Sequence, residues 1–382
     1  MLLVPFDDIP NVDGEIVRQE AKGLRGGLRI VLLQRYNEGR GGKFRLGETG
    51  GEPCRAHRAA MIIGAVLRTC PYAVALVLAL AGCGKSSSSA PRDTLVVYLA
   101  ASLTRPLQPA LDTFAARRRM VIQRESGASL EHARRITELH RVPDLIALAD
   151  VEVFSQLLMP EHVRWFAEFA RNRMIVGYTD RSRHAAELDS ISWTRILTLP
   201  DVEVGRPDPE VAPAGYRALL MLQLAERFYK SPGLAARILA NAPRRNMRPN
   251  AAELAVLLAA GELDYVLDYE SVATAYGFHY LRLPAAIDLG DPSRAPDYAL
   301  ARVRVRASSP NRDSLTFTGQ PIVYGLSVPS AATHHVSAND LAAFLLSRDG
   351  RAMMRAAHVD AIDGAPLIGA NVPDIVRAAA AR

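Results

Sequence analysis

Short apolar segments alternate with helical segments along most of this chain, and this order leaves few folds open to it. Leu95–Leu99 reads as a buried strand, and the segment after it has helical periodicity, with Pro106 near its first turn. The order then repeats in "RMVIQRESGAS", "SLEHARRITEL" and "PDLIALAD", which read as strand, helix and strand. Strands that alternate with helices predict a parallel sheet covered by helices.

The alternation restarts after a further apolar strand, "RMIVGYT", at residues 173–179. Two helical segments follow, "GYRALLMLQLAERFY" and "NAAELAVLLAAG", whereas residues 291–310 are rich in Pro and Arg and show little pattern. The strand "QPIVYGLSVP" then returns the chain to a last helical segment. Two α/β units joined by two apolar strands predict two lobes with a hinge and a cleft, where small ligands bind.

The segment "LVLALAGCGKSSSSAPRD" at residues 76–93 indicates how the chain is targeted. The apolar run is too short for a membrane span but long enough for a secretory signal, with Arg68 as its positive flank. The run ends in "LAGC", which resembles a bacterial lipobox and implies that a lipid is attached to Cys83 after cleavage before it. The Ser run that follows is typical of a flexible tether. The alternative is a short buried core helix that contains a Cys.

Sixty residues without a sustained pattern precede Met61. We therefore expect translation to start at Met61 and residues 1–60 to be a non-native upstream extension; a cytoplasmic extension before a signal anchor is the alternative. The predicted organisation is a signal peptide at 61–82, the lipidated Cys and tether at 83–93, lobe 1 at 94–177 plus 323–382, and lobe 2 at 178–322.

Cysteine use and charge exclude several classes of function. None of the three cysteines lies in residues 84–382, so that part has no disulfide, thiolate metal site or Cys nucleophile. The net charge of +6 comes without a clustered patch that would argue for nucleic acid. Four histidines are scattered without metal-ligand spacing, and we expect them on the solvated surface: His132, His140, His162 and His184.

Small hydrogen-bonding residues occur where the predicted helices begin. Ser102 and Ser129 stand at two such junctions, and Ala214 starts a third helix. Asn250, with Glu253 three residues later, is a plausible capping box. Helix N-termini carry unpaired N–H groups and partial positive charge, so several of them aimed into one cleft would bind a small oxyanion. The alternative is that these residues are simple helix caps.

These motifs together resemble the molybdate/tungstate-binding proteins of ABC importers, and most of all the archaeal-type branch. The resemblance covers residues 94–370 and rests on the ordered set "YLAASLTRPLQPALDTF", "SGASLEHARRITEL", "PDLIALAD", "NRMIVGYT", "APAGYRALLMLQLAERFY", "RPNAAELAVLLAAGELDYVLDYESVATAYG" and "QPIVYGLSVPSAA". It implies a type II periplasmic-binding-protein fold, with two α/β lobes joined by two hinge strands.

The resemblance also implies a function. The chain would capture molybdate or tungstate outside the inner membrane and deliver it to an ABC permease with its ATPase subunits. It would be a monomeric, membrane-anchored lipoprotein, periplasmic or at the cell surface. It would have no enzymatic activity, no cofactor and no nucleic-acid partner.

Carried over position by position, the resemblance also implies ligand-binding residues. Ser102 and Ser129 would donate from their hydroxyls, and Ala214 and Ala251 from their backbone N–H groups. "LDYES" contributes Asp268, Tyr269 and Glu270, with Tyr269 as an aromatic wall. In the archaeal-type branch two carboxylates contact the metal centre of the oxyanion; Asp268 corresponds to one, whereas Ala212 stands where the other is expected. No free metal cation is implied.

Three other functions remain to be weighed. A binder of another tetrahedral oxyanion or of a small organic acid would use the same fold. The porphobilinogen-polymerising enzymes share that fold, but they hold their cofactor on a Cys thiol, and residues 84–382 contain none. A cytoplasmic regulator would need a helix-turn-helix, yet a signal segment precedes residue 94.

Overall fold

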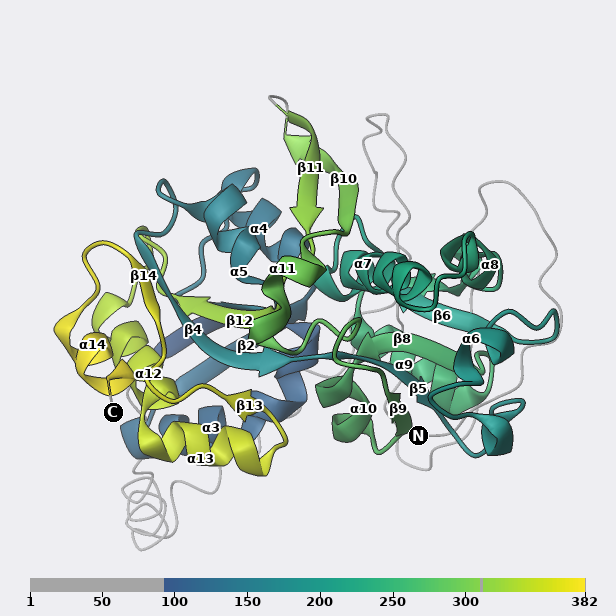
Figure 1. Ribbon diagram of the computed structural model, residues 1–382. Helices are drawn as coiled ribbons and strands as arrows, with labels where there is room; N and C mark the ends of the chain where they lie inside the picture. Colours follow the sequence, from purple (N-terminus) through teal and green to yellow (C-terminus); the bar gives the residue numbers. More distant parts are fainter. Residues whose placement is uncertain (1–92, 310–311, 382) are drawn as a thin grey trace, which may run out of the picture. The chain divides into compact units, whose positions relative to one another are not determined.

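The computed structural model describes residues 93–309 and 312–381 (Figure 1). The predicted upstream extension, signal peptide, Cys83 and all of the tether except its last residue lie outside these residues. Among the helices that are described, none is long and apolar enough to cross a membrane.

The first sheet forms the core of lobe 1. Its order is β13-β4-β12-β3-β1-β2, and β14 also pairs with β4. The strands are β1 (Thr94–Ala100), β2 (Val121–Gly127), β3 (Leu145–Leu148), β4 (Trp165–Asn172), β12 (Ile322–Ser327), β13 (Asp360–Ala361) and β14 (Leu367–Gly369). β1 pairs with β2 and with β3 in parallel, as the alternation of strands and helices predicts.

Helices cover both faces of this sheet (Figure 1). One face carries α3 (Ala101–Arg118), α12 (His335–Leu346), α13 (Arg348–Ala356) and α14 (Asp374–Ala380); the other carries α4 (Ser129–Thr137), α5 (Val151–Val153) and the π-helical turn η1 (Phe154–Leu158). The buried face of α3 presents Leu103, Leu107, Leu111 and Phe114, at the spacing of an amphipathic helix.

The second sheet forms the core of lobe 2, in the order β7-β6-β8-β5-β9. Its strands are β5 (Met174–Tyr178), β6 (Val204–Pro207), β7 (Met247–Arg248), β8 (Tyr265–Tyr269) and β9 (His279–Arg282). α7 (Pro213–Phe228) and α8 (Leu234–Ala240) lie on one side, and α9 (Ala251–Ala260) and α10 (Glu270–Tyr276) on the other (Figure 1). Short helical turns complete the lobe: α6 (Trp193–Ile196), α11 (Ala295–Tyr298), η2 (Ala185–Glu187), η3 (Arg244–Asn246) and η4 (Pro292–Arg294).

The chain passes between the two sheets at Asn172–Arg173 and returns before β12. Met174–Tyr178 hydrogen-bonds to β8 and β9, so it belongs to the second sheet. The first crossing therefore lies about five residues before the predicted boundary at 177/178. Because β4 and β5 are both buried in their own sheets, their apolar residues form one continuous run in the sequence. The sequence pattern therefore does not show where the chain crosses between the lobes.

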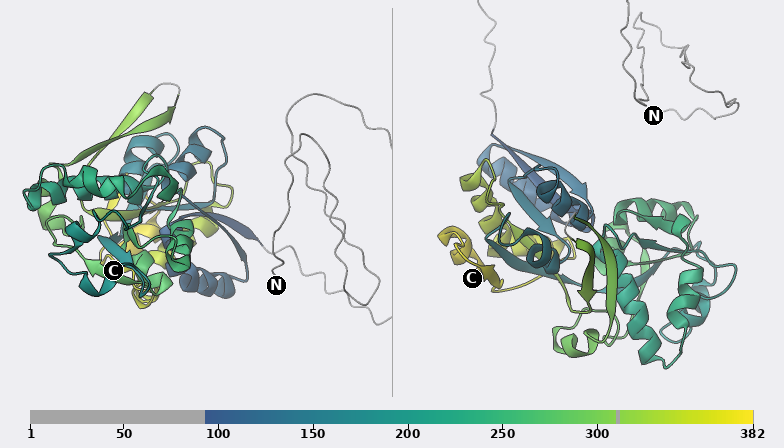
Figure 2. Two further views of the ribbon diagram at one scale, coloured as in Figure 1. Left: turned by 90° about the vertical axis from the view of Figure 1, so that its right-hand side faces the viewer. Right: turned by 90° about the horizontal axis from the view of Figure 1, so that it is seen from above.

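Residues 291–310, which show little pattern in sequence, include the first strand of a β-hairpin. The hairpin consists of β10 (Arg302–Ser309) and β11 (Arg312–Thr318), and it lies along the border of the two lobes (Figure 2). Val303 and Val305 are buried, whereas Arg302 and Arg304 are exposed, which is the alternation of a half-buried strand. The hairpin packs on α7, where the ring of Phe317 stacks on Tyr216 with centroids 4.0 Å apart.

Candidate ligand-binding site

The first residues of four helices line one pocket between the lobes. α3 and α4 reach it from lobe 1, and α7 and α9 from lobe 2. Its lining is Ala100, Ala101, Ser102, Gly127, Ala128, Ser129, Ala149, Pro207, Ala212, Pro213, Ala214, Asn250, Ala251, Asp268 and Tyr269. The enclosed space is only about 20 Å³, and beside it the Leu130 amide of α4 donates to the Val211 carbonyl, 3.1 Å away. The lobes thus meet around the pocket, which suits a small ligand.

The topology explains why helix starts gather here. β1 and β2 are parallel, so the helices that follow them, α3 and α4, begin at the same edge of the sheet. In lobe 2, β6 and β8 are also parallel, and α7 follows β6. Each helix start presents backbone N–H groups and the positive end of the helix dipole.

The two predicted ligand serines are not caps of their own helices. The N-cap residues of α3 and α4 are Ala100 and Ala128, and neither helix has a side-chain cap. Asn250, by contrast, caps α9: its Oδ1 accepts from the Glu253 amide at 3.0 Å, as the capping box predicts. The cap interpretation is therefore right for Asn250 and wrong for Ser102 and Ser129.

Both serines are buried, and the oxygen of each already accepts one hydrogen bond. Ser129 Oγ accepts from the Ala149 amide at 3.0 Å, and Ser102 Oγ accepts from the Tyr324 hydroxyl at 3.2 Å. Each serine therefore keeps its own hydrogen for a further acceptor.

Asp268 is the last but one residue of β8, lies at the wall of the pocket and is buried. Its Oδ1 accepts from the Tyr269 amide at 2.7 Å, and burial raises the pKa of its carboxyl group to about 7. The hydroxyl of the neighbouring Tyr269 is buried without a hydrogen-bond partner in the part of the chain that the structure describes. An unpaired buried hydroxyl is costly, so Tyr269 offers a further polar group and not only the predicted aromatic wall.

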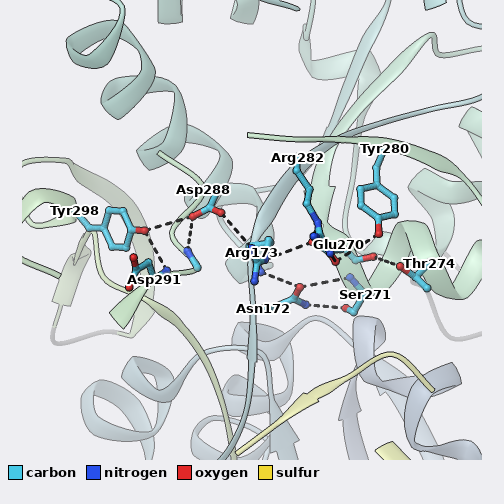
Figure 3. Close-up of polar contacts among 11 residues, drawn as sticks. Asn172, Arg173, Glu270, Ser271, Thr274, Tyr280, Arg282, Asp288, Asp291 and Tyr298 are labelled. Atoms are coloured by element: carbon cyan, nitrogen blue, oxygen red, sulfur yellow. Dashed lines mark hydrogen bonds and ion pairs between the residues drawn. The ribbon is translucent and has the colours of Figure 1, made fainter. Parts of the chain in front are cut away.

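Glu270 does not line this pocket, in contrast to the prediction. It begins α10, and its carboxylate accepts from Arg282 Nη2 at 2.6 Å and lies 3.4 Å from Arg173 Nε (Figure 3). The change from strand to helix after Tyr269 turns its side chain toward the hinge. Of the predicted ligand residues, Ser102, Ser129, Ala214, Ala251, Asp268 and Tyr269 line the pocket.

A buried ion pair that sequence reasoning missed joins the lobes beside the pocket. Asp150 follows β3, and its Oδ2 accepts from Arg217 Nη2 and from the Tyr216 hydroxyl, both at 2.6 Å. The side chains of Asp150 and Arg217 are 0% and 1% exposed. Both residues stand in motifs quoted for the family resemblance, "LIALAD" and "GYRALL", but their pairing joins positions 67 residues apart.

Two further expectations can be compared with the structure. Within residues 93–309 and 312–381, no group of three or more His, Cys, Asp or Glu side chains could hold a metal ion. His132, expected on the surface, is buried: its Nε2 is 3.1 Å from the Leu99 carbonyl oxygen and its ring stacks on Tyr98. Burial lowers its pKa to about 4.

Comparison with known proteins identifies the family. The profile described as "Bacterial extracellular solute-binding protein" matches residues 95–359. The chain belongs to this family. An extracellular solute-binding protein acts outside the cytoplasm, which agrees with the predicted export.

Two relatives match more than two thirds of this chain. The molybdate/tungstate-binding protein WtpA of Thermococcus kodakarensis is 31% identical over 329 residues, covering 78% of this chain and 91% of that protein. An uncharacterized solute-binding protein of Petrotoga mobilis is 38% identical over 261 residues, covering 68% and 81%.

A solved structure supports the predicted fold. The periplasmic molybdate-binding protein of Azotobacter vinelandii matches with a TM-score of 0.50 at 14% identity, covering 69% of this chain and 98% of that one. The predicted periplasmic-binding-protein fold is confirmed.

Proposed function

We propose that this protein binds molybdate or tungstate outside the cytoplasm and delivers it to an ABC permease with its ATPase subunits. One observation carries the proposal: the first turns of α3, α4, α7 and α9, with the hydroxyls of Ser102 and Ser129, line a single small pocket between the lobes. The relationship to WtpA of Thermococcus kodakarensis supports this choice of anion.

The donors suit a dianion that must later be released. Hydroxyl and amide N–H groups are neutral, and helix dipoles add only partial charges. The buried cation beside the pocket, Arg217, is already paired with Asp150. The ligand would therefore be held by hydrogen bonds and not by a direct ion pair.

Asp268 is the group that bears on the identity of the ligand. An ionised carboxylate repels a dianion unless it contacts the metal centre. Coordination of molybdenum or tungsten by Asp268 would turn this repulsion into binding. Ala212 lines the pocket where the second carboxylate of the archaeal-type branch is expected, so Asp268 would be a single carboxylate ligand.

A second candidate is a binder of another small oxyanion or organic acid. The observation that favours it is the raised pKa of Asp268. With this pKa the carboxyl group can either accept a hydrogen bond from a protonated oxyanion or donate one, and neither interaction needs a metal centre in the ligand. A protonated Asp268 would also donate a hydrogen bond to a carboxylate ligand.

In this proposal the protein is a monomer without catalytic activity or cofactor, anchored through a lipid on Cys83. Calorimetric titration of the purified protein with molybdate, tungstate, sulfate and phosphate tests the function. We expect molybdate and tungstate to bind far more tightly than the other two anions. Tightest binding of sulfate or phosphate would favour the second candidate, and binding of none of the four would exclude both oxyanion functions.

A further inference from the structure

A chain of hydrogen bonds leads from the pocket to the hinge between the lobes. Ser102 Oγ in the pocket accepts from the hydroxyl of Tyr324, 3.2 Å away on β12. The Tyr324 oxygen in turn accepts from Asn172 Nδ2 at 2.5 Å. Ser102, Tyr324 and Asn172 are all buried, and Asn172 stands at the crossing from β4 to β5.

The orientation of the Asn172 amide is fixed by its surroundings (Figure 3). Its Oδ1 faces two backbone amides, Arg173 N at 2.9 Å and Ser271 N at 3.4 Å, and an amide N–H can only donate. Its Nδ2 faces two hydroxyls, Tyr324 and Ser271, the latter at 2.7 Å. A flipped amide would set N–H against N–H, so Nδ2 is the atom that points to Tyr324.

This orientation determines the direction of the whole chain. Because Asn172 Nδ2 donates to the Tyr324 oxygen, the Tyr324 hydrogen is free to bond to Ser102 Oγ. Ser102 then has one of its two acceptor positions filled, and its own hydrogen remains for the pocket. The hydrogen of Ser129 also remains for the pocket, because its Oγ accepts from the Ala149 amide and this amide can only donate.

We propose that Tyr324, oriented by Asn172, is a positioning residue that directs the Ser102 hydrogen toward the ligand, so that an unprotonated ligand oxygen, the stronger acceptor, binds best at Ser102. The inference rests on the proposed function and adds its basis for selecting among anions. Sulfate, molybdate and tungstate present four unprotonated oxygens. Hydrogen phosphate binds best when its single hydrogen points elsewhere, and Asp268 is the carboxylate in the pocket that could accept it.

Tyr324→Phe tests the proposal in the purified protein. Without the Tyr324 hydroxyl, Ser102 can rotate and accept a hydrogen bond from a ligand. We expect molybdate and sulfate to bind about 3- to 10-fold more weakly, as for a lost neutral hydrogen bond. We expect hydrogen phosphate to lose less, so that its affinity relative to sulfate rises by about threefold or more. Calorimetric titration measures both anions at a pH where phosphate carries one hydrogen and sulfate none.

Tyr265→Phe is the matched control. Tyr265 is a buried tyrosine of β8 whose hydroxyl donates to the Arg183 carbonyl, so the same atom is removed without any link to Ser102. This variant should leave the phosphate-to-sulfate ratio unchanged.

Asn172→Asp gives a second test that does not depend on the folding of the first variant. An aspartate carboxylate cannot donate to Tyr324, so the Tyr324 hydrogen turns to the carboxylate and no longer orients Ser102, whose hydrogen can then turn to the Tyr324 oxygen. The phosphate-to-sulfate ratio should rise again.

Equal losses for sulfate and phosphate in Tyr324→Phe would mean a merely structural role and would overturn the proposal. That result differs from failure of the proposed function, in which the wild-type protein itself binds none of the anions. That outcome would also overturn the proposed role of Tyr324 in positioning Ser102.

Discussion

Ser102 and Ser129 each begin a helix without capping it, which separates them from most serines at such positions. Their hydroxyls face a pocket in which few other side-chain donors are free, so each would contribute a charge-assisted hydrogen bond to a dianion. This arrangement makes the two serines the most direct test of the site.

Ser102→Ala or Ser129→Ala should weaken binding of molybdate and tungstate by about 10- to 150-fold, as expected for the loss of one such bond. Calorimetric titration measures the loss, and circular dichroism checks the fold. Ser190→Ala, at an exposed serine, should have no effect. Losses below about twofold at both sites would show that neither hydroxyl contacts the ligand.

Substitution of Asp268 distinguishes coordination of the metal centre by its carboxylate from mere proximity of that carboxylate to the ligand. If its carboxylate coordinates the metal, Asp268→Asn should reduce binding of tungstate and molybdate and barely change sulfate. Removing a charge that only lies near the ligand should strengthen binding of every dianion alike. Titration of the variant with tungstate and sulfate separates the two, and equal gains for both anions would exclude coordination.

The same carboxyl group makes stability depend on pH. Burial raises its pKa from the ordinary 3.8 to about 7 in the folded state, so unfolding releases a proton at pH values between these two. The free energy of unfolding therefore falls as pH rises from about 4 to about 7, by up to a few kcal/mol from this group. Asp268→Asn should stabilise the ligand-free protein at about pH 8 and hardly at all at about pH 4. Denaturant unfolding at both pH values measures this, and an equal effect at both would contradict it.

At the scale of elements, the Asp150–Arg217 pair joins β3 of one lobe to α7 of the other. Arg217→Met would leave the Asp150 charge buried without its cation, and we expect a loss of about 3–5 kcal/mol in the free energy of unfolding. Adding Asp150→Asn should recover part of that loss, because no charge then stays buried. Arg195→Met, in an exposed pair with Glu187, should cost less than about 1 kcal/mol. A double variant as unstable as Arg217→Met would argue against a charge effect.

The sequence predicted those elements whose pattern is local. The parallel strands of lobe 1 and the capping box at Asn250 follow from periodicity and from short-range spacing. The hairpin was missed because its strand signal, the Arg and Val alternation at 302–306, directly follows a segment rich in Pro and Asp.

Contacts between distant positions lay beyond such reasoning. Glu270 follows Asp268 by two residues in the sequence, but α10 begins at Glu270 and turns its side chain away from the pocket. The pairing of Asp150 with Arg217 and of Tyr324 with Ser102 depends on how the lobes meet. Ser102 and Ser129 could be singled out from their places at helix starts, whereas the candidate ligand residues Asp268 and Tyr269 could be named only from the family resemblance.

At the scale of the whole molecule, the predicted export and anchoring rest on residues before the described part of the chain. If Cys83 carries a lipid, Cys83→Ser should leave the protein uncleaved or released from the membrane fraction. Fractionation of cells that express each form measures this. A variant that is cleaved and still found in the membrane fraction to the same extent would exclude lipid attachment at Cys83.

The position of β12 has a consequence for the order in which the molecule assembles. β12 lies between β3 and β4 in the first sheet, although it begins 174 residues after the end of β3 and 150 after the end of β4. The second sheet uses only residues 174–282, so it can form as soon as they are available. The first sheet keeps the facing edges of β3 and β4 unpaired until β12 arrives, and pairing over such a separation is slow. We therefore expect a refolding chain to form lobe 2 first, with lobe 1 as the part that exposes strand edges to aggregation.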